Sequence, residues 1–170
     1  MRALTTDEIQ AALGRLKDGL DRYLWLQRNL GLCNVSTDGH FQTRFNGFYR
    51  VRRGLPWRSD YFALMESAKV TGIGFQDALK EINRRTGRIE ASFASKLVAT
   101  LDPSKPVVDR FVLQNFELRL PRWGLPDRES RTVNLYNDLV MPTSTSSEAR
   151  AERRYEHSSS AGFQTLESPS

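Results

Sequence analysis

The fold depends most clearly on the stretch SFASKLVATLDPSKPVVDRFV, residues 92–112. Apolar residues before and within it recur at helical spacing, which indicates one helical face: Ile89, Phe93, Leu97 and Leu101. Asp102-Pro103 stops this helix, because proline cannot continue one. Pro106 precedes a second helix, marked by Val108, Phe111, Val112 and Phe116, and Asp109 stands near its start. The stretch therefore predicts two helices joined by a proline-bracketed turn.

The same spacing extends over most of the remaining chain. A first helix is expected after a capping pattern at Thr5 and Glu8, with a stop near Gly31. Its apolar face is Ile9, Leu13, Leu16, Leu20 and Leu24. Further helices are expected from about Asp60 to Lys69 behind a Ser59 cap, from Phe75 to Thr86-Gly87, and after Asp127. The fold class is predicted to be all-α.

Two segments depart from this helical pattern. Residues 32–59 contain several glycines and are expected to form loops, with one short hairpin near 41–53. Residues 142–170 are rich in serine, threonine and charge and poor in apolar residues, so a disordered tail is expected there. The predicted organisation is a compact helical domain over residues 1–141 followed by this tail.

Composition excludes several classes of protein. The chain has no apolar run long enough for a membrane span and no signal-peptide core, so a cytoplasmic protein is expected. One cysteine and two histidines give no zinc-ligand spacing, and no phosphate-binding or dinucleotide-binding glycine motif occurs. We therefore expect no metal, no cofactor and no membrane partner, and the oligomeric state stays open.

Basic residues are concentrated in one segment. The net charge is +5, and residues 40–59 alone contain five arginines and no acid. Such a segment, interleaved with aromatic residues, is typical of a surface that binds phosphates and stacks on bases, although it also fits a solvated face over core aromatics. The candidate phosphate contacts are Arg44, Arg50, Arg52, Arg53, Arg58 and Arg88, and the candidate stacking residues are Phe48, Tyr49 and Trp57.

Asp109 and Lys96 are the candidates for chemistry. Asp109 is placed to cap a helix, and a carboxylate there can also stabilise a cationic sugar or steer a water molecule. Lys96 lies beside the apolar face of its helix, where a lysine usually extends into water. It can also contact a phosphate or, with a depressed pKa, act as an amine nucleophile.

Longer segments of the chain show two resemblances to known families. FNGFYRVRR, RTGRIEASFASKLVATLDPSKPVVDRFVLQN and LYNDLV, within residues 45–140, resemble an uncharacterised family of bacterial and mobile-element proteins. FASKLVATLDPSKPVVDRFV resembles the C-terminal part of the helix-hairpin-helix DNA glycosylases, near the 8-oxoguanine-glycosylase-like branch. The second resemblance implies a helix-hairpin-helix-like fold, Asp109 as the carboxylate of base excision and Lys96 as the lysine nucleophile.

The leading hypothesis is therefore a DNA glycosylase-like protein that cleaves the N-glycosidic bond of a damaged or modified base in duplex DNA, with or without strand scission. Two alternatives remain. One is a nucleic-acid-binding module without catalysis, which needs only the basic and aromatic segment. The other is a truncated helical interaction protein in which Asp109 is only a cap.

Overall fold

The computed structural model describes residues 6–140, with side chains from residue 14 onward except Arg15. Seven helices and no strand occur in this part of the chain: α1 (Thr6–Leu30), α2 (Gly39–Tyr49), α3 (Leu55–Thr71), α4 (Phe75–Thr86), α5 (Ala91–Leu101), α6 (Arg110–Asn115) and α7 (Arg128–Val140). The all-α prediction is confirmed. The expected tail, 142–170, lies outside the described residues.

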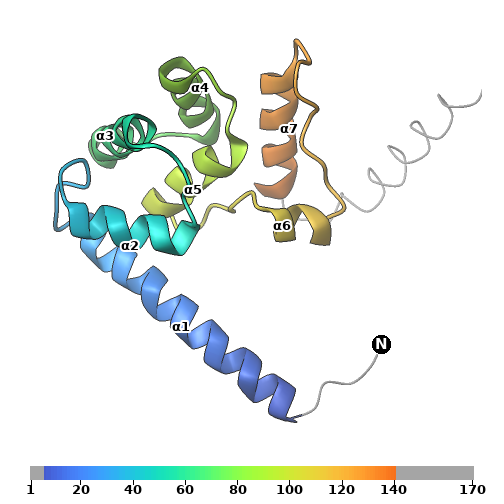
Figure 1. Cartoon of the computed structure of the whole chain (residues 1–170). Coiled ribbons are helices and arrows are strands. Elements are labelled where there is room, and N and C mark those ends of the chain that lie inside the picture. The colour runs from blue at the N-terminus through green and yellow to red at the C-terminus, as the bar shows by residue number, and fades with distance from the viewer. Residues whose placement is uncertain (1–5, 141–170) are drawn as a thin grey trace, which may run out of the picture.

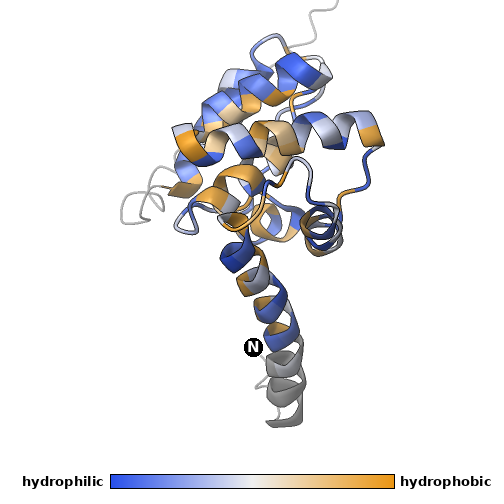
Figure 2. Cartoon of the chain, turned by 90° about the vertical axis from the view of Figure 1, so that its left-hand side faces the viewer, coloured by the Kyte–Doolittle hydropathy of each residue, from blue (hydrophilic) through white to orange (hydrophobic). Residues whose placement is uncertain are grey.

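The helices form a body from which α1 projects (Figure 1). Helix α2 packs on the C-terminal part of α1, α4 packs against α3, α5 and α7, and the short α6 lies below α5 and α7 (Figure 1). Apolar residues line the sides of the helices that face one another, and polar residues face outward (Figure 2). Hydrophobic burial between helices therefore holds the body together.

Aromatic side chains make up the centre of the core. Phe41, Phe45, Tyr61 and Phe62 are almost completely buried. The ring of Phe45 lies 5.4 Å from that of Phe62, edge to face, and 5.9 Å from that of Tyr61. Because such ring pairs add to the stabilisation from buried area, helices α2 and α3 are joined firmly at this point.

The hairpin expected near 41–53 is wrong, and the loops expected over residues 32–59 are found only at 32–38 and 50–54. Residues 39–49 form helix α2, whose start is fixed by Asp38: its carboxylate accepts a hydrogen bond from the N–H of Phe41 at 2.8 Å. The helix is stable despite Gly39 and Gly47 because Phe41 and Phe45, one turn apart, are both completely buried. Tertiary packing has overridden the glycine signal.

Two other boundaries differ from the prediction. Helix α3 begins at Leu55 with Gly54 at its N-cap, not at Ser59, because Pro56 is well suited to the first turn of a helix. Helix α6 begins only at Arg110, after an extended segment that contains Val108. The expected ends of α4 at Gly87, which has a φ of 68°, and of α5 at Asp102 are confirmed.

Candidate nucleic-acid site

Asp109 is the N-cap of helix α6, as the sequence predicted. Its carboxylate accepts a hydrogen bond from the N–H of Val112 at 2.8 Å. The preceding residue, Val108, is buried, and its N–H donates to the hydroxyl oxygen of Ser95 at 2.8 Å. Ser95 is itself completely buried in α5. The carboxylate is therefore held in place by α5 on one side and by the first turn of α6 on the other.

Lys96 follows Ser95 in α5 and turns its amine toward the end of α2. The amine lies 3.4 Å from the carbonyl oxygen of Tyr49, to which it donates a hydrogen bond, and 5.0 Å from the ring centroid of Phe93. Burial lowers the pKa of Lys96, and the negative charge of Asp109 opposes this shift. The two candidate groups are thus close enough to interact electrostatically.

An open cavity of about 790 Å³ contains both groups, and we call it the Lys96 cavity. It lies between α1, α2, α5 and α6, and its lining comprises Tyr23, Phe48, Tyr49, Arg50, Arg52, Ser92, Lys96, Val107, Asp109, Arg110 and Phe111. Four basic side chains therefore face one acid, Asp109, across aromatic walls. Such a lining suits an anionic ligand that carries a flat ring.

Arg50 reaches this cavity through an unusual backbone conformation. It ends helix α2 in the left-handed region, with a φ of 52°. The N–H of Val51 then donates to the carbonyl oxygen of Asn46 at 2.9 Å, which closes the helix end. Within residues 6–140, neither Arg50 nor Arg52 forms an ion pair. Their guanidinium groups are therefore available to a ligand.

The other predicted arginines lie outside the cavity lining. Arg53 forms an ion pair with Glu90 at 2.7 Å, and Arg44 stacks on the ring of Trp25, 4.3 Å from its centroid. Arg58 is partly buried, and Arg88 is exposed beyond the C-terminal end of α4. Of the six predicted phosphate contacts, the structure brings only Arg50 and Arg52 to Asp109 and Lys96.

The predicted stacking residues divide in the same way. Phe48 and Tyr49 line the Lys96 cavity, whereas Trp57 stacks on Tyr61 with 4.9 Å between ring centroids and packs against the core. Burial raises the pKa of Tyr49, whose hydroxyl lies 3.3 Å from that of Thr100. Tyr49 is therefore a fixed wall of the cavity.

Sequence reasoning missed two aromatic members of the lining. Tyr23 comes from α1, which no local pattern connects to Asp109. Phe111 is predicted from its spacing to belong to the apolar face of its helix, but 63% of it is exposed. In the sequence, the only sign that Phe111 belongs to the site is its position directly after Asp109 and Arg110. That position does not show whether the Phe111 ring is buried or exposed.

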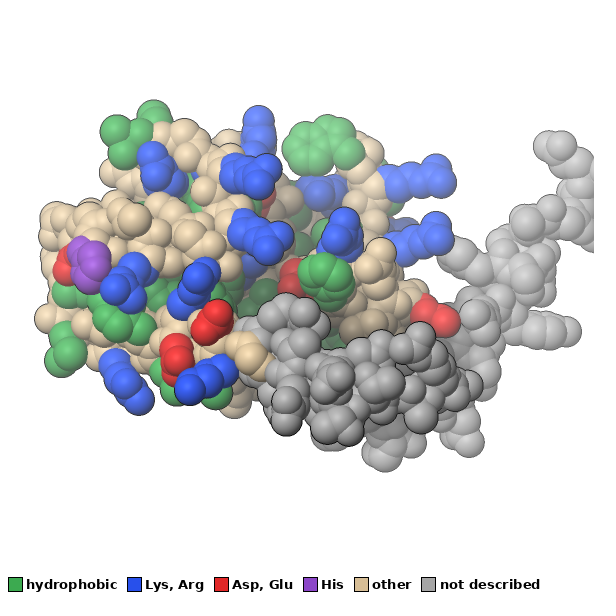
Figure 3. Space-filling model, turned by 60° about the horizontal axis from the view of Figure 1, so that its bottom comes forward, with side chains coloured by type: hydrophobic (Ala, Val, Ile, Leu, Met, Phe, Trp, Pro, Cys, Tyr) green, Lys and Arg blue, Asp and Glu red, His purple; other side chains and the backbone are tan. Residues whose placement is uncertain are grey.

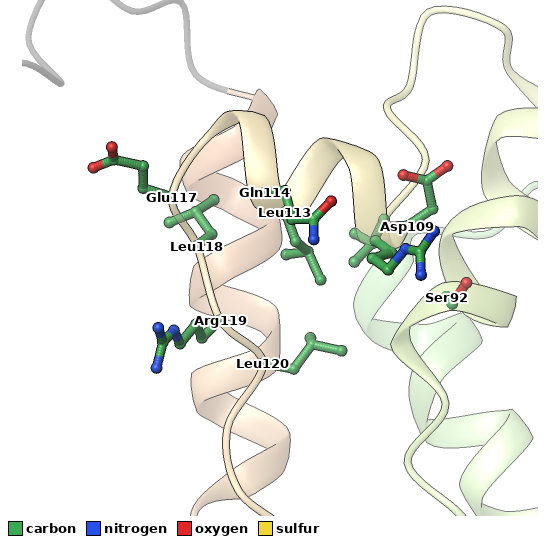
Figure 4. Close-up of a pocket in the computed structure, with 10 residues that line it drawn as sticks. Ser92, Asp109, Leu113, Gln114, Glu117, Leu118, Arg119 and Leu120 are labelled. Carbon is green, nitrogen blue, oxygen red and sulfur yellow. The ribbon is translucent and has the colours of Figure 1, made fainter.

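A second hollow of about 890 Å³, which we call the α6 hollow, is also lined by Asp109 (Figure 4). It shares Ser92, Asp109 and Arg110 with the Lys96 cavity. Leu113 and Leu120 project toward its open space, while Glu117 and Arg119 point away (Figure 4). Asp109 thus lines two hollows, one walled by aromatic and basic residues and the other by a mixture of aliphatic and polar residues.

One face of the molecule is basic. Lysine and arginine side chains predominate over acids on the face that Figure 3 shows. Among residues 6–140, no helix is long and apolar enough to cross a membrane, and no group of three or more potential metal ligands occurs. Comparison with protein-family models, with curated proteins and with solved structures finds no match. Any functional assignment therefore depends on the site itself.

Proposed function

We propose that this chain is a DNA glycosylase-like protein that cleaves the N-glycosidic bond of a damaged or modified base in duplex DNA. The observation that carries the proposal is the common position of Asp109 and Lys96 in one open cavity with Arg50 and Arg52. These residues come from different parts of the chain: Arg50 and Arg52 from the end of α2 and the loop after it, Lys96 from the middle of α5, and Asp109 from the N-cap of α6. A capping role for Asp109 alone does not require the lysine or the arginines.

Asp109 would stabilise the positive charge that develops on the sugar as the base leaves. A carboxylate fixed by a backbone N–H is oriented before the reaction, and fixed charges of this kind are effective in catalysis. The hydrogen bond from Val112 at 2.8 Å and the anchoring of Val108 on Ser95 provide this fixation. Asp109 lines both hollows and is partly exposed, so a ligand could reach it.

Lys96 would act as the amine of a bifunctional enzyme. As its Nζ bonds to C1′ of the sugar, the C1′–N bond to the base would break, the base would leave with the bonding electron pair and take a proton from water, and the substituted amine would lose a proton to water. An amine nucleophile must be uncharged, and burial promotes this state by lowering the pKa of Lys96. The carbonyl oxygen of Tyr49, 3.4 Å away, holds the amine at the cavity wall.

The cavity suits an extruded base. Its volume, about 790 Å³, lies within the range of roughly 300–1,000 Å³ that is usual for ligand sites. Phe48, Tyr49 and the exposed ring of Phe111 offer faces for stacking. Arg50 and Arg52 would bind the phosphates on either side of the extruded nucleotide, since guanidinium groups pair well with phosphate oxygens.

The helix pair before Asp109 supports the helix-hairpin-helix-like assignment. Helices α4 and α5 pack closely and are joined by a short turn, residues 87–90, that starts at Gly87 in the left-handed region. The N–H groups at the start of α5 have no side-chain cap. Backbone donors at such a turn are suited to a DNA phosphate.

The test is base release from duplex oligonucleotides that each contain one oxidised, deaminated or alkylated base, detected by mass spectrometry of the free base. We expect the wild-type chain to release at least one of them, and the surface variant Lys80→Gln to do so equally well. Absence of release from all substrates by protein with intact helical circular dichroism would contradict the proposal.

One observation favours a second function, a nucleic-acid-binding module without catalysis. Arg50 and Arg52 form no ion pair within residues 6–140. Binding of phosphates by these two arginines does not require a catalytic role for Asp109 or Lys96. Each phosphate contact contributes about 0.9 to the slope of log affinity against log salt for duplex DNA. We expect the double variant Arg50→Ala/Arg52→Ala to reduce the slope by about 2. Lys80→Ala/Arg84→Ala, at exposed positions of α4, is the charge-matched control, and DNA binding without base release would select this second function.

A further inference from the structure

A separate cavity of about 550 Å³, which we call the Tyr136 cavity, lies between α7, the first turn of α4 and the C-terminal ends of α3 and α5. Helix α7 runs beside α4 at this place (Figure 1). The Tyr136 cavity shares no lining residue with the Lys96 cavity or the α6 hollow. The proposed action on DNA therefore leaves it without a role.

The first turn of α4 presents free backbone donors to this cavity. Gly74, the N-cap, provides no side-chain cap, and the first hydrogen bond of the helix runs from the N–H of Ala78 to the carbonyl oxygen of Gly74 at 2.9 Å. Within residues 6–140, the N–H groups of Phe75 and Gln76 have no acceptor. Both residues line the cavity. An acceptor in the cavity would satisfy N–H groups that a helix start leaves unpaired.

Tyr136 adds a buried donor at the same place. Its ring stacks on that of Phe75, with 3.8 Å between centroids and 6° between planes, and only 3% of the residue is exposed. Its hydroxyl is buried and has no hydrogen-bond partner among the described residues. Burial, with a smaller contribution from the charge of Asp102, raises the pKa of Tyr136 to about 12, so the hydroxyl stays protonated at neutral pH. A buried hydroxyl without a partner is unfavourable, so an acceptor is expected beside it.

The charged side chains of the lining already have partners. The carboxylate of Asp102 accepts hydrogen bonds from the N–H and the hydroxyl of Ser104, at 3.0 and 2.7 Å, and the amine of Lys105, 3.8 Å away, offsets its charge. Lys69 is paired with Glu66 at 2.8 Å. No lysine or arginine of the described lining is therefore left to balance the two charges of a phosphate, whereas a helix N-terminus is suited to the single charge of a carboxylate.

The rest of the wall is apolar. Ile73, Leu101 and Val133 line the cavity and pack against the hydrophobic core. The volume lies within the range of roughly 300–1,000 Å³ that is usual for small-molecule sites, and such sites combine apolar walls with a few converging polar groups. A ligand of the Tyr136 cavity should therefore have an apolar body as well as an acceptor group.

We propose that the Tyr136 cavity binds a small organic acid that has one carboxylate and an apolar body. The carboxylate would accept hydrogen bonds from the N–H groups of Phe75 and Gln76 and from the hydroxyl of Tyr136, which together satisfy most of its acceptor positions. The positive end of α4 would stabilise its charge. Because this cavity is separate from the Lys96 cavity, the proposal does not depend on the action of the chain on DNA.

Titration of the isotope-labelled full chain with benzoate, phenylacetate and hexanoate, followed by NMR, tests the proposal. We expect at least one acid to bind with a Kd below about 10 mM and to shift the N–H resonances of Phe75 and Gln76. The corresponding uncharged amides are the controls and should bind at least about tenfold more weakly. The proposal is overturned if no acid gives a saturable shift, if the saturable shifts lie away from α4, or if acid and amide bind equally well.

Tyr136→Phe removes the hydroxyl and keeps the stacked ring. Its affinity for the acid that the wild-type chain binds best should fall about tenfold or more, because a hydrogen bond to a carboxylate is lost. The free energy of unfolding without ligand should not fall, because the hydroxyl has no partner in the unliganded chain. Wild-type affinity in folded Tyr136→Phe would contradict the proposed binding mode.

Gly74→Asp tests the backbone donors of α4. An aspartate at the N-cap accepts from N–H groups of the first turn and repels a bound acid, so affinity should fall about tenfold or more. A side chain at Gly74 meets no atom closer than 3.9 Å, so the fold can accommodate it. Gly54→Asp makes the same change at the uncapped N-cap of α3, outside the cavity lining, and should bind as the wild type does. Equal affinity of the two variants would rule out binding at the start of α4.

Discussion

The hydroxyl oxygen of Ser95 accepts a hydrogen bond from the N–H of Val108 at 2.8 Å, and both residues are buried. This bond connects the helix that carries Lys96 to the segment that carries Asp109. The same hydroxyl donates to the carbonyl oxygen of Ser92 at 3.1 Å. The relative position of the two candidate catalytic groups thus depends on one buried serine.

Replacing Ser95 should therefore weaken the fold as well as the site. Ser95→Ala leaves the N–H of Val108 buried without a partner, which costs about 1–3 kcal/mol. The free energy of unfolding from urea titration measures this loss. Ser59→Ala, at an exposed position of α3, is the control and should stay within about 0.5 kcal/mol of wild type. Equal stability of the two variants would mean that the Ser95 bond does not anchor Asp109.

The left-handed conformation of Arg50 predicts an unusual response to glycine. A side chain in this region costs about 1–2 kcal/mol, and glycine loses about 0.5–1 kcal/mol through its flexibility in the unfolded chain. Arg50→Gly should therefore raise the free energy of unfolding by up to about 1 kcal/mol. Arg52→Gly should lower it by about 0.5–1 kcal/mol, because Arg52 has no positive φ. The reverse order in urea titrations would contradict the observed end of α2.

Lys96 predicts a pH-dependent difference in stability. Burial lowers its pKa in the folded chain below the ordinary value of 10.5. Between the two pKa values the unfolded chain binds more protons, so the contribution of Lys96 to stability rises with pH there and is unfavourable below. Lys96→Met should therefore raise the free energy of unfolding near neutral pH, and this gain should shrink as the pH approaches 10.5.

Chemical denaturation at several pH values, with the exposed Lys80→Met as control, measures this effect. The difference in free energy of unfolding between wild type and Lys80→Met should not decrease in this way as the pH rises. A Lys96→Met gain that stays constant up to pH 10.5 would show that the amine has its ordinary pKa in the folded chain.

The sequence predicted the helical elements best where a cap or stop residue coincides with an apolar repeat. The α5–turn–α6 stretch is such a case, and Asp109 indeed caps α6. Helix α2 was missed because Gly39 and Gly47 suggested loops, although Asp38 carried the capping signal. Its stability comes from Phe41 and Phe45 in the core, which is a tertiary effect.

The candidate site was predictable in its chemistry but not in its membership. The contact between Lys96 and the carbonyl oxygen of Tyr49 joins distant parts of the chain, and so does the pairing of Arg53 with Glu90. The contact of Lys96 with Tyr49 brings the neighbouring Arg50 into the cavity, whereas the ion pair with Glu90 holds Arg53 outside it. Local spacing contains no information about such contacts, so six arginines appeared equivalent in the sequence.

Asp109→Asn is the measurement that tests the central claim most directly. Asparagine caps a helix as well as aspartate does, so this variant should keep its free energy of unfolding, whereas Asp109→Ala should lose about 0.5–2 kcal/mol. If the charge of Asp109 stabilises the positive charge on the sugar as the base leaves, the rate of base release by Asp109→Asn should be about 100- to 1,000-fold lower than that of wild type. Release by Asp109→Asn at the wild-type rate would contradict the catalytic role and leave Asp109 as a helix cap alone.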